Sequence, residues 1–352
     1  MDYQKTLDEL ILNLIRENGS DLHLSTGRLP AIRVNRQLVF LRQNKVLTHE
    51  DIIGFLTVML GQKKLESFLN DQEVDFSYQY KTEGRLRGNA FIQRGNIALA
   101  LRLIPKVKTL DELNLPEVLK VFARKKQGFF LVVGPVGQGK STTLASIVEL
   151  INSERAEHIV TIEDPIEHLY EPKQSIIDQR EVGIDTHSFE QALKSVFRED
   201  VNVILLGEMR SPESISTAVT AAETGHLVFS TLHTNNASQT IDRIIDAFPA
   251  EQQAQIRIQL SSSLLGIFSQ RLVPRISGGL VPAYELLINN NAVANLIRER
   301  RTHEIDVVIE TSFEQGMIDM NRSLLDLVRR GEITMESAFQ YSINPKALER
   351  LV

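Results

Sequence analysis

The sequence contains no cysteine, no tryptophan and no long apolar run, and each absence excludes a class of protein. With no cysteine among 352 residues, disulfide bonds and cysteine-ligated zinc sites are ruled out. No apolar run approaches the roughly 20 residues that a membrane-spanning helix needs. The first residues, Met1 to Lys5, lack the basic and then apolar pattern of a secretion signal. We therefore expect a protein without disulfides, zinc, a membrane span or a secretion signal.

Aromatic residues and positive charge are also scarce. Aromatic residues make up 6% of the chain, and the formal net charge is −6. A general nucleic-acid binder is expected to be basic and to offer aromatic rings on which bases can stack. Nucleic acid is therefore an unlikely partner, although a local basic patch is compatible with this composition. The hydrophobic fraction of 42% is ordinary for a globular protein.

The feature most informative about function is the stretch Gly134 to Ser141, GPVGQGKS. It fits G-x-x-x-x-G-K-[ST], the phosphate-binding loop (P-loop) of NTPases. An apolar run at 128–133 predicts a buried strand before it, and apolar residues at helical spacing over 141–151 predict a helix after it. A chance glycine-rich turn is the alternative, and the flanking elements argue against it. The predicted nucleotide-binding residues are Gly134, Pro135, Val136, Gly137, Gln138, Gly139, Lys140, Ser141 and Thr142.

Each part of this loop has a chemical reason. Glycines allow the backbone to turn tightly and to approach phosphates closely. The helix N-terminus adds partial positive charge. Lys140 is expected to reach the β- and γ-phosphates and Ser141 to hold Mg²⁺. The loop predicts binding of ATP or GTP.

Element patterns divide the chain into two predicted domains. Residues 1–104 predict a small α+β domain that includes a β-hairpin at 85–92 and 97–104. Residues 105–112, which begin with Pro105, predict a linker. Residues 113–352 alternate strands and helices, as in an α/β domain with a mainly parallel sheet. In this domain we expect strands at 128–133, 159–163, 202–207 and 227–232, and helices from Pro249 to about 270 and at 291–300, 321–330 and 334–341.

Two strands end in acids. Glu208 closes the apolar run from Val203 and is the candidate general base or water-positioning group. An ordinary core strand that ends at the surface is the alternative. Glu163 and Asp164 end another strand just before Pro165, where ligands of α/β sheets bind. They suit a role around Mg²⁺ or water, and a solvated acidic turn is the alternative.

Histidines bracket the strand at 227–232. His233 follows its carboxyl end, close enough to sense a γ-phosphate, whereas His226 precedes it. A structural histidine is the alternative for both. Zinc is not expected, because the spacing is not a helical i, i+4 pair and no third ligand is evident.

Four arginines lie on the predicted hairpin of the small domain. Arg85 and Arg87 share one face of a strand, and Arg94 and Arg102 follow. They are candidates for arginine fingers that balance charge in a transition state. A solvated basic sheet face is the alternative.

Taken together, these motifs resemble the secretion ATPase superfamily. Its Walker A, Asp-box, Walker B and His-box segments match residues 134–141, 161–167, 205–210 and 222–234. Within the superfamily, the chain is most similar to the retraction ATPases of type IV pili. Residues 20–25 and 85–91 resemble the small PAS-like N-terminal domain of that family. Residues 292–299 resemble its C-terminal AIRNLIRE motif.

The resemblance implies a RecA-like P-loop ATPase domain preceded by a PAS-like domain, working as a homohexamer with ATP and Mg²⁺. Glu208 would be the catalytic glutamate, supported by Glu163. Arg87 and Arg102 would approach the nucleotide, while Ser141 and Glu208 would hold Mg²⁺ through the nucleotide and water. The motor would lie in the cytoplasm, peripheral at the inner membrane face. There it would act on an inner-membrane platform protein to drive pilin disassembly and twitching motility.

Two observations favour retraction over the other functions in the superfamily. Assembly ATPases usually carry a four-cysteine zinc motif and additional N-terminal domains, and this sequence has neither. A pilus assembly or type II secretion ATPase and an accessory retraction paralogue stay open. Two functions from other classes also stay open: a nucleic-acid translocase, and a nucleotide-gated ring without turnover. The chain departs from the family pattern at Val136, Gln138, Val201, Asn202, Ser211 and Ala294.

Overall fold

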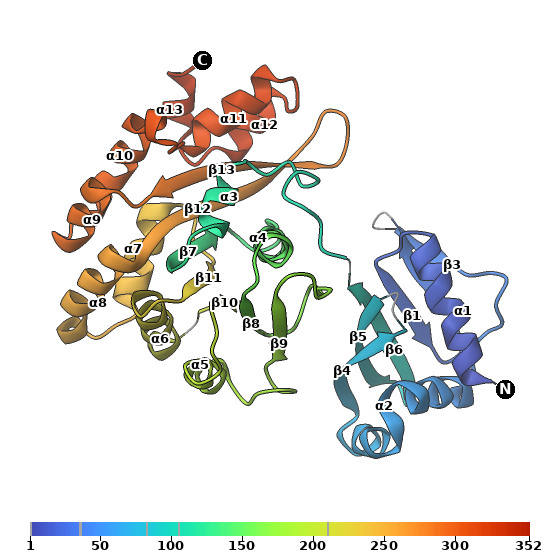
Figure 1. The fold of residues 1–352 in the computed structure, drawn as a ribbon. Helices are drawn as coiled ribbons and strands as arrows, with labels where there is room; N and C mark the ends of the chain where they lie inside the picture. The colour runs from blue at the N-terminus through green and yellow to red at the C-terminus, as the bar shows by residue number, and fades with distance from the viewer. Residues whose placement is uncertain (1, 35–36, 82–83, 105, 210) are drawn as a thin grey trace. The chain divides into compact units, whose positions relative to one another are not determined.

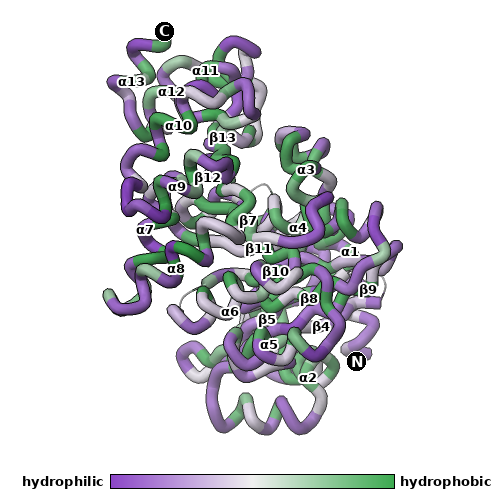
Figure 2. Tube along the Cα trace, turned by 60° about the vertical axis from the view of Figure 1, so that its left-hand side comes forward, coloured by the Kyte–Doolittle hydropathy of each residue, from purple (hydrophilic) through white to green (hydrophobic). Residues whose placement is uncertain are grey.

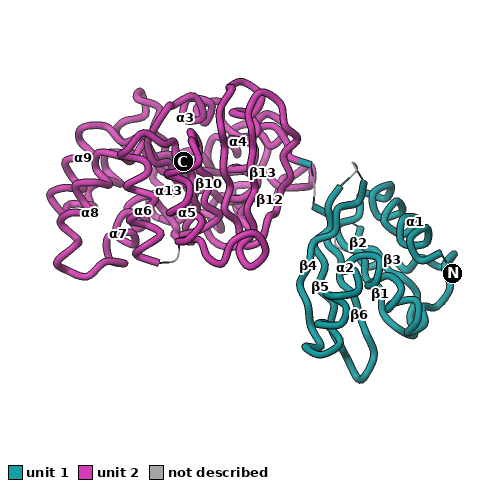
Figure 3. The backbone as a smooth tube through the Cα atoms, turned by 60° about the horizontal axis from the view of Figure 1, so that its bottom comes forward, with its two compact units in different colours: residues 1–106 teal, residues 107–352 magenta. Residues whose placement is uncertain are grey.

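The chain folds into two compact units, which Figure 3 colours separately. The computed structural model describes residues 2–34, 37–81, 84–104, 106–209 and 211–352. Unit 1 comprises residues 1–106 and unit 2 residues 107–352. Pro105, the first residue of the predicted linker, lies outside the described residues. None of the helices in the described part of the chain is both long and apolar enough to span a membrane.

Unit 1 is an antiparallel sheet with two helices against one face. The strand order is β3-β2-β1-β6-β5-β4. Alternate residues such as Leu22 and Leu24 are fully buried, because successive side chains of a strand point to opposite faces. The predicted hairpin at 85–104 is confirmed. The elements are α1 (Tyr3–Arg16), β1 (Asp21–Ser25), β2 (Ala31–Val34), β3 (Gln37–Phe40), α2 (His49–Asp71), β4 (Glu73–Tyr80), β5 (Gly84–Gln93) and β6 (Asn96–Ile104).

Unit 2 is built on a seven-stranded sheet of order β13-β12-β7-β11-β10-β8-β9. All of its strand pairs are parallel except β12 with β13, so the predicted mainly parallel sheet is confirmed (Figure 1). Its strands are β7 (Gly128–Val133), β8 (His158–Glu163), β9 (Ile176–Glu181), β10 (Val203–Leu206), β11 (Leu227–Leu232), β12 (Leu264–Pro274) and β13 (Leu280–Ile288). Its helices are α3 (Leu119–Ala123), α4 (Lys140–Glu154), α5 (Phe189–Val196), α6 (Pro212–Glu223), α7 (Ala237–Asp246), α8 (Ala250–Ser263), α9 (Asn291–Arg298), α10 (Ile305–Thr311), α11 (Met320–Arg329), α12 (Met335–Tyr341) and α13 (Pro345–Glu349), with short 3-10 helices at Thr302–Glu304 and Phe313–Gln315.

One predicted helix is wrong. The helix expected from Pro249 to about residue 270 ends at Ser263, and the chain continues as β12. The segment after Ser263 begins with a short apolar run at 264–268, and such a run does not distinguish a buried strand from a buried helix. Pairing with β7 on one side and β13 on the other decides the outcome. The pairing of β12 with β7 joins segments more than a hundred residues apart, so local periodicity carries no sign of it.

Strand β7, which lies between β12 and β11, separates two hydrophobic cores; Figure 2 colours the chain by hydropathy. Phe129, Leu131 and Val133 belong to the core formed with α5 to α10. Phe130 and Val132 belong to the core formed with α3 and α4. Both faces of the sheet are therefore covered, and the open position is the edge where its parallel strands end.

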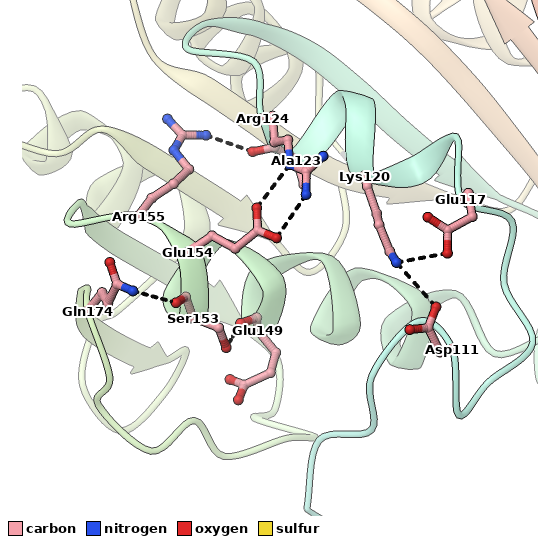
Figure 4. Close-up of polar contacts among 10 residues, drawn as sticks. All are labelled: Asp111, Glu117, Lys120, Ala123, Arg124, Glu149, Ser153, Glu154, Arg155 and Gln174. Carbon is pink, nitrogen blue, oxygen red and sulfur yellow. Dashed lines mark hydrogen bonds and ion pairs between the residues drawn. The ribbon is translucent and has the colours of Figure 1, made fainter.

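The far end of α4 is fastened to the segment that precedes β7 (Figure 4). Arg124 donates two hydrogen bonds of 3.0 and 2.9 Å to Glu154. Arg155 donates to the backbone carbonyls of Ala123 and Lys125, each at 2.7 Å. The helix that follows the phosphate-binding loop is thus held at its C-terminal end, which leaves its N-terminal end to face the ligand.

Candidate active site

Four adjacent parallel strands end at one cleft. The phosphate-binding loop follows β7, His233 follows β11, Glu208 lies two residues after β10, and Glu163 ends β8. The cleft has a volume of about 500 Å³, and these residues line it together with Ser141. Carboxyl ends of parallel strands are the usual ligand site of an α/β sheet. The structure therefore brings the motifs in unit 2 together, as expected from their positions at strand ends.

The loop has the backbone shape that its glycines suggested. Gly134, Gly137 and Gly139 have φ values of 147°, 77° and 78°, which L side chains rarely adopt. Gly139 lies directly before α4, whose N-terminus faces the cleft. Val136 is 80% exposed at the loop.

Lys140 is the charged residue of the phosphate-binding loop, and its side chain is largely buried. It is only 7% exposed. Its Nζ donates to the Pro135 carbonyl at 3.0 Å and lies 3.2 Å from His233 Nδ1. Burial lowers the pKa of Lys140, and the charges of Glu167 and Glu208 oppose this effect. A phosphate group in the cleft would stabilise the ammonium that burial destabilises.

His233 lies between Lys140 and Glu208. An ammonium can only donate hydrogen bonds, so Nδ1 accepts from Lys140 and the ring proton resides on Nε2. That nitrogen lies 3.9 Å from Glu208 Oε2. The Glu208 side chain is 21% exposed and the His233 side chain 49%. The three groups therefore form a chain from the phosphate-binding loop to the candidate base, with its last contact longer than a hydrogen bond.

Glu163 is the buried acid of the site. It is 9% exposed, and burial raises its pKa, although hydrogen bonds from Thr161 and Gln179 act in the opposite direction. The Thr161 hydroxyl donates to Oε1 at 2.6 Å. Glu163 and Glu208 thus occupy the same cleft with different solvent exposure.

The cleft also offers a donor set suited to Mg²⁺. The Ser141 hydroxyl and the carboxylates of Glu208 and Glu163 line it together. Hard oxygen donors are the ligands that Mg²⁺ prefers, usually alongside phosphates and water. These residues fit the metal that the motif predicts.

The other predicted residues lie elsewhere. Arg87 and Arg102 belong to unit 1, where they face each other across β5 and β6. Arg102 Nε donates to Asp21 at 2.9 Å. Their approach to a nucleotide stays a prediction. For His226 the structural alternative fits, because its Nδ1 lies 3.0 Å from the Ala221 carbonyl and its ring packs against Phe197.

Two departures from the family pattern keep a local structural role. Ser211 caps α6, since its hydroxyl accepts from the Ser214 backbone N–H at 3.2 Å. The Asn202 side chain accepts from the His158 backbone N–H at 2.9 Å. Val201 and Ala294 are buried apolar side chains, 7% and 9% exposed.

Several residues in or beside the cleft were not predicted from the sequence. Glu167 lines the cleft, and Thr231 donates to the Gly207 carbonyl at 2.6 Å. Gln270 contacts the phosphate-binding loop from β12. Glu167 and Thr231 belong to motifs in which the sequence pattern drew attention to other residues, namely Glu163 and His233. Gln270 stood in the segment predicted as helix, so nothing local pointed to it.

Comparison with known proteins identifies similar chains. A family model described as Type II/IV secretion system protein matches residues 3–279. The type IV pilus retractation ATPase PilT of Pseudomonas aeruginosa is 43% identical over 333 residues, covering 94% of this chain and 96% of that protein. The type IV pilus ATPase PilU of the same organism is 38% identical over 350 residues, covering 98% and 91%. A crystal structure of the pilus retraction motor PilT with bound ADP superposes with a TM-score of 0.91 at 46% identity, covering 97% of this chain and 98% of that one.

Proposed function

This chain belongs to the Type II/IV secretion system protein family, and on that premise we propose that it hydrolyses ATP to power retraction of type IV pili. The resemblance inferred from its four motifs is confirmed. The observation that carries the proposal is the convergence of loop, base and histidine on one cleft. The similarity to PilT over nearly the whole chain supports retraction in particular.

The geometry supports a separate role for each residue of the cleft in ATP hydrolysis. Water attacks the γ-phosphorus of ATP, the bond to the β-phosphate oxygen breaks, and ADP and phosphate leave. Glu208 orients the water and takes its proton, while Glu163 supports it. Lys140 and the backbone N–H groups of the loop stabilise charge that develops on the phosphates. His233, placed between Lys140 and Glu208, is suited to link γ-phosphate occupancy to the base. Bound Mg²⁺, held by Ser141 and through water by Glu208, would neutralise phosphate charge.

Several finer features belong to the same proposal. Unit 1 corresponds to the PAS-like domain and unit 2 to the ATPase domain. Subunits assemble as a homohexamer, in which Arg87 and Arg102 approach a nucleotide. The motor acts in the cytoplasm on an inner-membrane platform protein, and hydrolysis drives pilin disassembly.

A second candidate is an accessory role beside another retraction motor. It is favoured by the 38% identity to PilU over almost the whole chain. The departures at Ser211 and Ala294 are compatible with either role, because the structure gives Ser211 a capping role and buries Ala294.

The test is Glu208→Gln in the native host, with surface pili counted and twitching measured. We expect more surface pili and lost motility, because assembly would continue without retraction. Glu251→Gln, at an exposed glutamate in the first turn of α8, is the matched control and should change neither. Bald cells would indicate an assembly motor, and unchanged pili at normal protein level would indicate the accessory role.

A further inference from the structure

Gln270 on β12 contacts the phosphate-binding loop at two points. It is 3% exposed. Its Nε2 donates to the Gln138 carbonyl at 2.7 Å. Its Oε1 accepts from the Thr143 hydroxyl at 2.7 Å. One side chain thus joins the turn of the loop to the first turn of α4.

These contacts determine the orientation of the amide. A carbonyl can only accept, so the NH₂ group of Gln270 must face Gln138. The oxygen then faces Thr143, which is 1% exposed and must donate its hydroxyl proton. Both polar ends of this buried side chain are satisfied only in this arrangement.

The loop is fastened to the same strand at a second place. Gln138 Oε1 accepts from the backbone N–H of Leu272 at 2.6 Å. Gln138 stands where the family pattern has serine, and its longer side chain spans this distance. β12 runs beside β7 with Ser269 opposite Val133, the last residue of β7, so Gln270 lies at the level where the loop begins.

The close approach of β12 also explains two glycines. A Cβ added at Gly134 would lie 2.5 Å from the Gln270 carbonyl oxygen, and one at Gly139 would lie 3.0 Å from Gln270 Nε2. Both positions have a positive φ as well. At Gly134 both space and backbone conformation exclude a side chain, whereas at Gly139 the backbone conformation disfavours one and the Gln270 side chain would have to shift to admit it.

We propose that Gln270 is a positioning residue for nucleotide binding, which holds the phosphate-binding loop in its binding-competent shape through Gln138 and Thr143. The inference rests on the proposed function, since it concerns the same nucleotide. Gln270 acts through the loop and not on the reacting atoms. Its loss should therefore weaken binding of ADP and ATP and raise KM, while kcat at saturating ATP changes little.

The first variant is Gln270→Glu in the full chain. The new carboxylate accepts from Thr143 but faces the Gln138 carbonyl with a second acceptor, and it can donate there only when protonated. We expect the Kd for ADP to rise about 10- to 100-fold at pH 8, with partial recovery as the pH falls. kcat should stay within about threefold. Gln255→Glu, the same change at an exposed position on α8, should leave Kd, KM and kcat unchanged.

A second pair of variants decides the matter if Gln270→Glu does not fold. Thr143→Val removes the hydroxyl and should raise the Kd for ADP about 5- to 10-fold, whereas Thr143→Ser keeps it and should restore binding. Thr217→Val, at a half-buried threonine of α6, is the control.

Three results would overturn the inference. They are a Kd within twofold of the native value in Gln270→Glu and Thr143→Val, a fall in kcat with unchanged KM, and equal loss of binding in Thr143→Val and Thr143→Ser. If the native protein itself bound no ADP or ATP, the proposed function would fail instead, so the two failures are distinguishable.

Discussion

The two walls of the nucleotide cleft are held in different ways. On the loop wall, Lys140, Gln138 and Thr143 all have hydrogen-bond partners at 2.6 to 3.2 Å. On the acid wall, Glu208 lies 3.9 Å from His233, and Glu163 is a buried carboxyl with a raised pKa. A binding wall that is complete before the ligand arrives minimises the ordering cost of binding. On the acid wall Glu163 also accepts a 2.6 Å hydrogen bond from Thr161. The 3.9 Å separation of His233 Nε2 and Glu208 Oε2 is a contact of the kind that often tightens only when the substrate is bound.

The largest effect is expected when the positive charge of the loop wall, Lys140, is removed. Lys140→Ala removes the ammonium that faces the phosphates, so ATP hydrolysis should fall by about 10³-fold or more, and ATP binding should weaken with it. Steady-state phosphate release and a nucleotide titration measure both. Lys126→Ala, at an exposed lysine, should leave both unchanged. In this comparison the loop wall determines nucleotide affinity and the acid wall determines turnover. If Lys140→Ala kept its affinity for ATP, that assignment of the loop wall would be wrong.

Glu163→Gln sharpens the comparison on the acid wall. We expect kcat to fall about tenfold or more with nearly unchanged Kd for ADP. Because burial raises the pKa of Glu163, this carboxyl ionises at a higher pH than an ordinary glutamate. Activity that needs its charge therefore rises as the pH increases through that pKa, and the glutamine variant should lack this part of the pH–kcat profile. A variant with the native profile would remove Glu163 from the chemistry.

Glu285 on β13 lies outside both walls and tests how burial acts on a carboxyl group in this fold. Its Oε1 accepts from the Ala237 N–H at the start of α7 and from the Ser269 hydroxyl, and burial raises its pKa from 4.5 to about 7. The folded state holds this proton more tightly than the unfolded state, so the stability it contributes is present below pH 4.5 and is lost as the pH rises to about 7. Between pH 4.5 and pH 8 the native protein should therefore lose about 3 kcal/mol of unfolding free energy that Glu285→Gln does not lose.

Denaturant unfolding at the two pH values measures this difference. Glu251→Gln, at an exposed glutamate, is the control, and its unfolding free energy should show the same pH dependence as that of the native protein. Equal pH dependence of native protein and Glu285→Gln would contradict the buried-acid account.

The smallest effect is expected at a departure from the family pattern outside both walls. Ser211→Ala removes the cap of α6 and the hydrogen bond that the Ser211 hydroxyl donates to Glu190 at 2.7 Å, so it should cost about 1 kcal/mol of stability. Ser211→Thr keeps the hydroxyl and should cost nearly nothing. kcat and KM should stay near native in both. A large loss of kcat in Ser211→Thr would show that this departure has a catalytic meaning.

Much of this site was predictable because its residues lie at strand ends inside local motifs. An apolar run followed by a glycine loop, an acid or a histidine identifies the strand and its carboxyl end together, as for Lys140 and Glu208. Burial of Glu163 was not predictable, because it depends on Thr161, Gln179 and the neighbouring strands. Gln270 was not predictable for a stronger reason: its contacts with the loop arise from the pairing of β12 with β7, of which the local periodicity carries no sign.

The most direct measurement compares binding and turnover in purified Glu208→Gln. We expect a Kd for ATP within about threefold of native and a kcat lower by about 10²- to 10⁴-fold, because the proposed role of Glu208 is to orient and deprotonate the attacking water, whereas Lys140 and the loop bind the phosphates. A kcat close to native would contradict the assignment of the base. A loss of ATP affinity as large as the loss of turnover would contradict the division between the two walls.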